Sequence, residues 1–189
     1  DGSQNVAIGS FALGGALGGT ADGSADNVVI GYNAGSGNWA DQDCSNLVAI
    51  GSGAMQGALA GDTADGSVAV GKSALAALTS GARNTAIGYQ ASLTLTTGAD
   101  NTSLGYRALD ELVDGSGNTA IGSYAMGDMF GGTTSDGSSN NTAIGKDAAS
   151  GTWADQDCSN LVAIGSGALI GALAGDTADG TVAVGRSAL

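Results

Sequence analysis

Two short acidic loops carry carboxylates that could bind a metal ion. Asp41 and Asp43 flank a glutamine, and Asp155 and Asp157 repeat this arrangement 114 positions later. Alternate carboxylates on a turn suit a hard cation such as calcium. The surrounding sequence has neither EF-hand spacing nor the glycine-rich nonapeptide of calcium-binding β-rolls. Solvated turns, in which aspartates bond their own backbone, are therefore the favoured interpretation, and calcium is the alternative.

Catalysis has few residues to draw on. The chain contains no histidine, the commonest general base. Acid pairs such as Asp62 with Asp65, Asp176 with Asp179, or Asp110 with Glu111 could be offered as acid and base. A repeated sequence, however, copies neighbouring carboxylates whether or not they react. We predict that the protein is not an enzyme and that it has no catalytic residue.

A short repeat must position these residues. A segment of the form Val/Thr-Ala-Ile-Gly, or close to it, occurs ten times, and its third residues lie 17 to 23 positions apart. Length differences fall in one segment of Gly, Asp, Ser and Thr per unit, as loops on a constant scaffold do. The third residues are Ile8, Ile30, Ile50, Val70, Ile87, Leu104, Ile121, Ile144, Ile164 and Val184.

Each unit predicts one coil of a parallel β-solenoid. β-Branched residues two apart, flanked by asparagine and glycine, favour a short strand over a helix. We expect a corner at the glycine, a second arm and a return loop, so the fold is all-β with about ten stacked coils. Asparagines near the strands are expected to bond from coil to coil. They are Asn5, Asn27, Asn46, Asn84, Asn101, Asn118, Asn141 and Asn160.

Residues 1–189 form a single repetitive domain. The coils between Ile50 and Ile164 span 114 residues, so six coils make a super-repeat, with one copy at 1–113 and a partial second copy at 114–189. Neither end has a polar capping unit. We therefore expect this to be a slice of a longer fibre, or a subunit that continues end to end into its neighbours.

Both faces of a segment such as Val48 to Gly51 are apolar. Because side chains alternate in a strand, valine and isoleucine share one face, and alanine and glycine share the other. We expect the large residues to fill the coil and the alanine face to pack against another layer, since parallel strands are normally covered on both sides. A partner copy of the chain would supply that layer; the alternative is that the small residues face solvent.

Cys44 and Cys158 occupy identical places six coils apart. That separation is about 29 Å at the strand spacing, whereas a disulfide needs Cα atoms within about 7 Å. They cannot pair within one chain, so buried thiols are favoured over a bond to another chain. Trp39 and Trp153 are interpreted as caps on the apolar core, with glycan stacking as the alternative.

Charge and hydropathy limit the classes of partner that the chain can bind. The net charge is −13, with only five basic residues, so no basic patch is expected and nucleic acid is excluded as a partner. No apolar run reaches about 18 residues, so no membrane insertion is expected in this segment.

The units at 84–91, 101–108 and 118–125, of the form Asn-Thr-Ala-Ile-Gly-Tyr-x-Ala or close to it, resemble the head repeats of trimeric autotransporter adhesins. Similar repeats occur in bacteriophage tail fibres and other extracellular fibre proteins. The resemblance implies a left-handed β-roll, three chains packed into a rod, and adhesion to a surface or matrix. The coils here are longer than the compact repeat of that family, which indicates decorated loops.

We expect a structural or adhesive fibre segment outside a cell or virion, whose main activity is self-association into a rod or filament. The alternative is a receptor-binding head that contacts a surface glycan or protein through variable loops such as 127–140. Ice binding would require a regular threonine array, and only Thr85, Thr102, Thr119 and Thr142 would stack. Valine replaces threonine in the other coils, which makes that function the weaker hypothesis.

Overall fold

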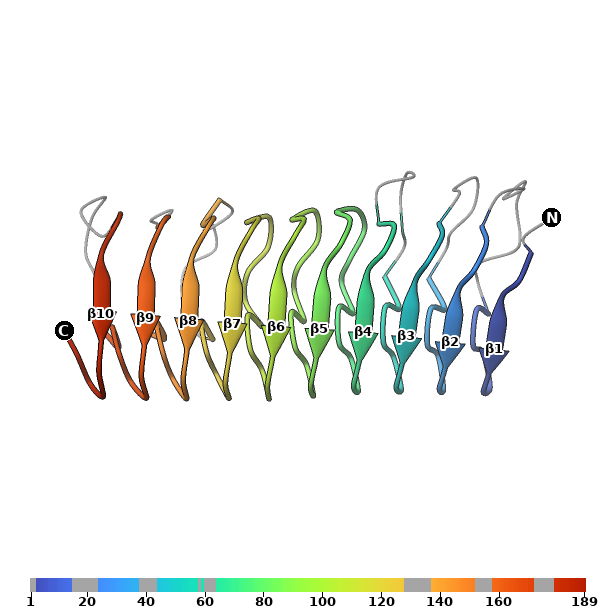
Figure 1. Cartoon of the computed structure of the whole chain (residues 1–189). Coiled ribbons are helices and arrows are strands. Elements are labelled where there is room, and N and C mark those ends of the chain that lie inside the picture. Colours follow the sequence, from blue (N-terminus) through green and yellow to red (C-terminus); the bar gives the residue numbers. More distant parts are fainter. Residues whose placement is uncertain are drawn as a thin grey trace.

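The structure is a computed structural model, which describes residues 3–14, 24–37, 44–57, 59, 64–127, 137–151, 158–171 and 179–189. Ten strands form one parallel sheet and follow each other in chain order along a rod (Figure 1). None of the described residues is helical. The strands are β1 (Val6–Ile8), β2 (Val28–Ile30), β3 (Val48–Ile50), β4 (Val68–Val70), β5 (Thr85–Ile87), β6 (Thr102–Leu104), β7 (Thr119–Ile121), β8 (Thr142–Ile144), β9 (Val162–Ile164) and β10 (Val182–Val184). The predicted parallel β-solenoid, with one strand per coil, is confirmed.

The register of the sheet follows the sequence repeat. Val48 pairs with Val68 and Ile50 with Val70, and the same positions pair in every other adjacent coil. Coil length changes from 17 to 23 residues without altering this register. The extra residues therefore lie between the paired strands, as the sequence predicts.

A glycine ends every strand and turns the chain. These ten glycines have φ between 127° and 144°, a region that L side chains rarely adopt. In all but the last coil, a Cβ atom on this glycine would lie 2.2–2.7 Å from a backbone atom of the equivalent glycine in the next coil. Only glycine fits at this corner, because the backbones of stacked coils touch there.

The central residue of the strand, alanine in most coils and Val29 in β2, fills the coil from the strand side, whereas the first and third residues point outward. Ala49, Ala86 and Ala120 at the centres of their strands are fully buried, whereas Ile87 and Leu104 are 39% and 44% exposed. The prediction that the large strand residues point inward is wrong. The reason is that in most coils the second arm occupies the interior with a large side chain, so the strand has room only for a small one; in the β2 coil the arm residue is Gly35, and Val29 fits. The largest fully buried side chains are Leu47, Met55, Leu59, Leu75, Leu78, Leu95, Leu109, Leu112 and Met126.

Buried asparagines link neighbouring coils at the entry to the strands. The Asn101 side-chain oxygen accepts the backbone N–H of Asn118 at 2.9 Å, and the Asn118 oxygen accepts that of Asn141 at 3.0 Å. The ladder is confirmed at Asn5, Asn27, Asn84, Asn101, Asn118 and Asn141.

Asn46 and Asn160 do not belong to this ladder, contrary to the prediction. They stand one position earlier in the repeat, are exposed, and have φ near 60°. Leu47 and Leu161 take the ladder position in those coils and donate their backbone N–H groups to Asn27 and Asn141. Asparagine serves there as a residue that tolerates a left-handed backbone.

Candidate interaction surfaces

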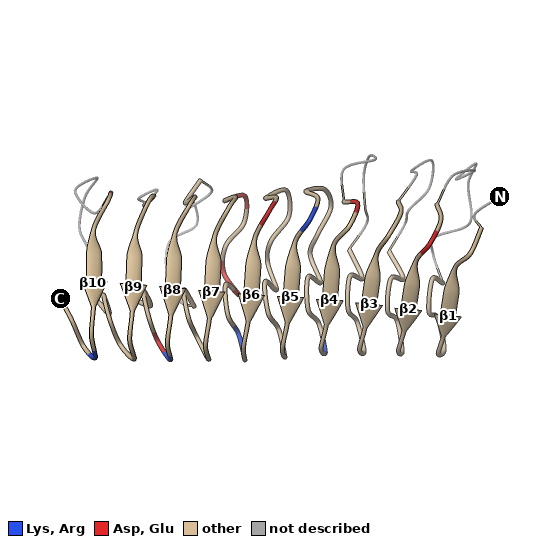
Figure 2. Ribbon diagram, in the orientation of Figure 1, with Lys and Arg blue, Asp and Glu red and all other residues tan. Residues whose placement is uncertain are grey.

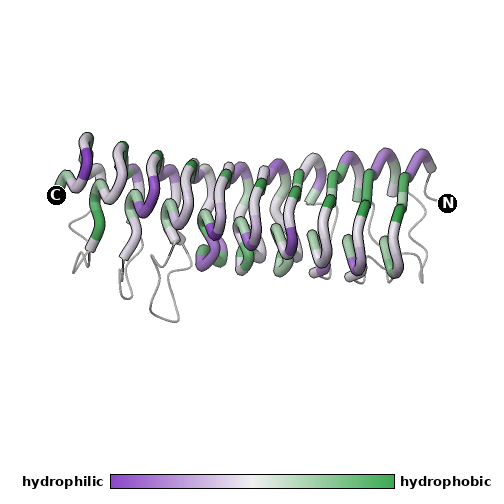
Figure 3. The backbone as a smooth tube through the Cα atoms, turned by 90° about the horizontal axis from the view of Figure 1, so that it is seen from below, coloured by the Kyte–Doolittle hydropathy of each residue, from purple (hydrophilic) through white to green (hydrophobic). Residues whose placement is uncertain are grey.

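The outward residues of the strands form one continuous apolar surface. We call the first and third residues of all ten strands the outer strand face; the first is valine or threonine, and the third is isoleucine, valine or leucine. Figure 3 shows hydrophobic segments recurring along successive coils. Ile144 and Ile164, in the middle of the C-terminal half, are each 38% exposed. This surface carries no charged residue.

None of the described residues covers the outer strand face. Parallel sheets in proteins are almost always covered on both sides, because their strands are apolar on both sides. Here the inner side packs on the arms of the coil, and the outer side leaves aliphatic side chains in contact with water. Contiguous exposed apolar surface of this kind is typical of interaction sites.

A second surface lies immediately beyond the strands. We call the two residues that follow the strand glycine in every coil the corner row. All four tyrosines and four of the five basic residues of the chain occupy it. Its aromatic and basic members are Phe11, Tyr32, Lys72, Tyr89, Tyr106, Arg107, Tyr124, Lys146 and Arg186. Figure 2 shows the basic residues gathered along this edge of the rod, apart from Arg83.

The aromatic side chains of the corner row contact one another across coils. The rings of Tyr89 and Tyr106 stack with centroids 5.3 Å apart and planes 7° apart. Tyr124 meets Tyr106 edge to face at 5.3 Å. The Lys72 ammonium lies 5.9 Å from the Tyr89 ring, and the Arg107 guanidinium lies 5.3 Å from that of Tyr124. Tyr89 and Tyr106 still expose 40% and 47% of their surface.

Acidic neighbours hold two of the cations in this row. Arg107 pairs with the buried carboxylate of Asp110, and Lys146 pairs with Asp147 at 2.6 Å. The hydrogen bond to Asp147 raises the pKa of Lys146. Hydrogen bonding to Tyr124 is the main cause that raises the pKa of both Tyr106 and Arg107. Arg107 and Lys146 are therefore held as cations within the row.

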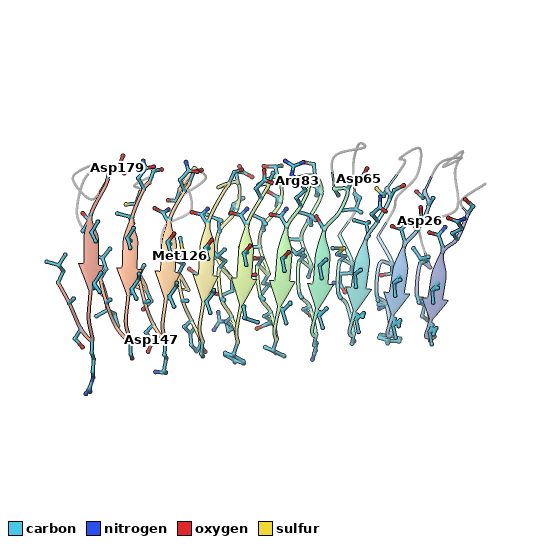
Figure 4. The ribbon with its side chains drawn as sticks, viewed as in Figure 1. Asp26, Asp65, Arg83, Met126, Asp147 and Asp179 are labelled. Carbon is cyan, nitrogen blue, oxygen red and sulfur yellow. The ribbon has the colours of Figure 1, made fainter. Side chains whose placement is uncertain are left out.

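Acids predominate among the described charges at the opposite edge of the rod. Figure 4 places Asp26, Asp65 and Asp179 at this loop edge with Arg83, whereas Asp147 lies at the other edge. Asp65 and Asp179 accept the backbone N–H groups of Ser45 and Ser159, at 2.8 and 2.7 Å. Each of these two carboxylates accepts from the preceding coil, 20 residues earlier in the chain, so the solvated-turn interpretation, in which aspartates bond their own backbone, does not describe these hydrogen bonds.

One exposed ion pair also lies on the loop edge. Arg83 forms two hydrogen bonds to Asp100, at 2.6 and 2.8 Å. This hydrogen bonding is the main cause that lowers the pKa of Asp100, and it raises that of Arg83. Both side chains are more than half exposed, so solvent screening leaves the pair with little weight in stability.

The predicted calcium residues Asp41, Asp43, Asp155 and Asp157 lie outside the described residues, as do Trp39, Trp153, Asp62 and Asp176. Within the described ranges no three His, Cys, Asp or Glu residues come together as a metal site. Most of the proposed receptor loop, residues 128–136, is also undescribed. The calcium and loop-binding hypotheses therefore stay predictions.

Cys44 and Cys158 are 0% and 1% exposed, which confirms the prediction of buried thiols.

The four threonines Thr85, Thr102, Thr119 and Thr142 do stack in register, on the outer strand face. Of the acid pairs considered for catalysis, Asp110 forms an ion pair with Arg107.

Among the described residues none forms a helix long and apolar enough to cross a membrane.

The corner row is the surface that the sequence analysis missed. The five basic residues of this acidic chain are far apart in the sequence, so their number alone predicts no basic patch. The signal was available in the repeat register, because the basic residues and tyrosines fall at the same one or two positions after the glycine. Stacking the coils turns that positional preference into a row.

No protein-family model matches the chain. No curated protein matches it, and no solved structure does.

Proposed function

We propose that this chain is a segment of an extracellular structural or adhesive fibre, and that its main activity is self-association through the outer strand face. The observation that carries this proposal is the apolar outer side of the ten-stranded sheet, which no described residue covers. A rod with this side in water would bury it against the nearest complementary surface. Another copy of the same chain presents such a surface along its whole length.

The shape of the outer strand face supports a second copy as the partner. Every coil presents one valine or threonine and one aliphatic residue, at a constant axial spacing set by the strand pairing. Two such ladders can interdigitate over many coils, whereas a compact globular partner would cover only a few. The resemblance to adhesin head repeats and tail fibres, in which several chains pack into a rod, also supports self-association and a location at a cell or virion surface.

Charge on the outer strand face tests this proposal. We substitute Leu104→Asp together with Ile144→Asp, two exposed positions in β6 and β8. The wild-type chain is expected to sediment as an oligomer and to form rods in electron micrographs, and the variant is expected to sediment as a monomer with an unchanged circular dichroism spectrum. Burying two carboxylates without partners would cost more than the interface gains there.

The matched control adds the same two negative charges at the loop edge, through Asn140→Asp with Asn160→Asp. Both positions are exposed and have φ near 60°, which aspartate tolerates. The control should remain oligomeric. A monomeric wild-type chain, or a loss of assembly that is equal in both variants, would overturn self-association through this face.

A further inference from the structure

The outer strand face cannot by itself specify how two rods align along their axes. Its first residue changes between adjacent coils only from Val68 to Thr85 and from Thr142 to Val162. A shift of one copy by one coil therefore leaves nearly all apolar contacts equivalent. Because each shifted register buries almost the same apolar side chains, the outer strand face does not select one register.

The corner row differs from coil to coil. No two adjacent coils have the same pair of corner residues; Lys72-Ser73, for example, is followed by Tyr89-Gln90 and then Tyr106-Arg107. The one identical pair is Ser52-Gly53 and Ser166-Gly167, six coils apart. The corner row is thus the part of this side of the rod in which each coil can be told from its neighbours.

The corner row also adjoins the outer strand face. Ile87 and Tyr89 are separated by one glycine, and they are exposed to the same extent, 39% and 40%. Two copies of the chain that pack through the outer strand face at Ile87 would therefore have the tyrosines and cations of the corner row at the border of their interface. Charged and polar residues that flank an apolar seam set partner alignment in coiled coils in the same way.

The side chains of the corner row are held in place before any partner arrives. Tyr106 is stacked on Tyr89 and touched by Tyr124, and Arg107 is fixed by Asp110 and the Tyr124 ring. Rigid tyrosine and arginine side chains are the residue types that dominate protein interfaces. Because Arg107 and Lys146 already have acidic partners in the chain, these contacts favour a protein surface over a free anion as the occupant.

We propose that the corner row fixes the axial register in which two copies of this chain pack through their outer strand faces. This inference rests on the proposed function, because it requires that self-association takes place. A copy shifted by one to five coils from the aligned position places a different pair of corner residues opposite every pair in the row. A shift of six coils restores the Ser-Gly pair, but it leaves only four coils in contact.

Register is measured by chemical cross-linking between two sets of chains. Cys44→Ala and Cys158→Ala first remove the buried thiols. One set then carries a single cysteine at Thr85, and the size-tagged other set carries one at Thr85, Thr102, Thr119 or Thr142. These sites lie on the outer strand face of adjacent coils, β5 to β8, so the four mixtures sample offsets of zero to three coils. The mixtures are refolded together and treated with a short bis-maleimide.

The intact corner row should give one preferred offset. We expect its yield to exceed that of the neighbouring offsets at least about tenfold, which corresponds to about 1.4 kcal/mol. The corner variant carries Lys72→Ser, Tyr89→Ser, Tyr106→Ser and Tyr124→Asn, residues that other coils hold at the same positions, as in Ser52 and Asn33. It should still associate, with yields at neighbouring offsets within about twofold of one another, since serine then follows the strand glycine in five consecutive coils, those of β3 to β7.

The matched control is Arg83→Asn with Asp100→Asn, the exposed ion pair at the loop edge. It should keep the single preferred offset. A second variant, Lys72→Tyr with Tyr89→Lys, keeps the composition and reorders the row. Cross-linking of this variant to chains with the natural order should fall at least about tenfold below the yield between identical chains at the preferred offset.

The outcomes separate the two proposals. An oligomeric corner variant that keeps the preferred offset overturns the register role alone. A wild-type chain that is monomeric in sedimentation overturns self-association and register together. If the corner variant does not fold, the variant Lys72→Tyr with Tyr89→Lys tests the register role instead. Undiminished cross-linking of this variant to chains with the natural order would overturn that role.

Discussion

The side-chain oxygen of Asn84 accepts two hydrogen bonds from Asn101, one coil further along the rod. The backbone N–H of Asn101 donates at 3.0 Å and its side-chain amide at 3.2 Å, and both residues are buried. Asn101 repeats the arrangement toward Asn118, and its amide also donates to the carbonyl of Gly115 at 2.8 Å. Each asparagine therefore joins its own return loop to the strands of two coils.

Loss of one asparagine from the ladder should lower the stability of the stacked coils. In Asn101→Ala, the buried Asn118 N–H and the Gly115 carbonyl lose their partner. We expect the free energy of unfolding to fall by about 3 kcal/mol, because buried groups left without a hydrogen bond retain their desolvation cost. Urea unfolding followed by circular dichroism measures the change. The control Asn160→Gly, at an exposed position where other coils have Gly66 or Gly117, should change stability by less than about 0.5 kcal/mol.

The glycine corner provides a second prediction. In Gly88→Ala the added Cβ would lie 2.2 Å from the carbonyl oxygen of Gly105, and φ at this position is 140°. Strain and the clash with backbone together should cost about 3 kcal/mol or more. Thermal unfolding of the 189-residue chain measures this. Equal destabilisation by Gly185→Ala, the equivalent position with no backbone close to the added Cβ, would show that contact between coils is not the cause.

Most of the fold could be predicted from the sequence because stacking repeats each local choice. The glycine corner, the strand and the asparagine before it recur at fixed spacing, and parallel pairing puts equal positions beside each other. The inward and outward faces could not be assigned in the same way. Both faces of Val-Ala-Ile-Gly are apolar, so alternation alone does not distinguish them.

The assignment depends on packing between distant residues. Leu109 and Met126, four residues after their strand glycines, already fill the interior, and strand alanines complete it. The β5 and β6 coils show the same packing of arm against strand with polar residues. Ser92 stands where other coils have an arm leucine, and its hydroxyl bonds the hydroxyl of the buried Ser103 in β6 at 2.9 Å. A threonine at the first strand position in four coils was the sequence signal that this side faces outward.

The orientation of the strand yields the last prediction. It is tested in the charged Leu104→Asp, Ile144→Asp background, in which self-association is expected to be absent and stability belongs to the single chain. Ala86 is fully buried, so Ala86→Leu should lower the free energy of unfolding by at least about 2 kcal/mol through overpacking. Its neighbour Ile87 is 39% exposed, so Ile87→Ala should lower it by less than about 1 kcal/mol. Urea titration of both variants gives the two values. The reverse order would mean that isoleucine fills the coil, and it would remove the apolar outer strand face on which both proposals depend.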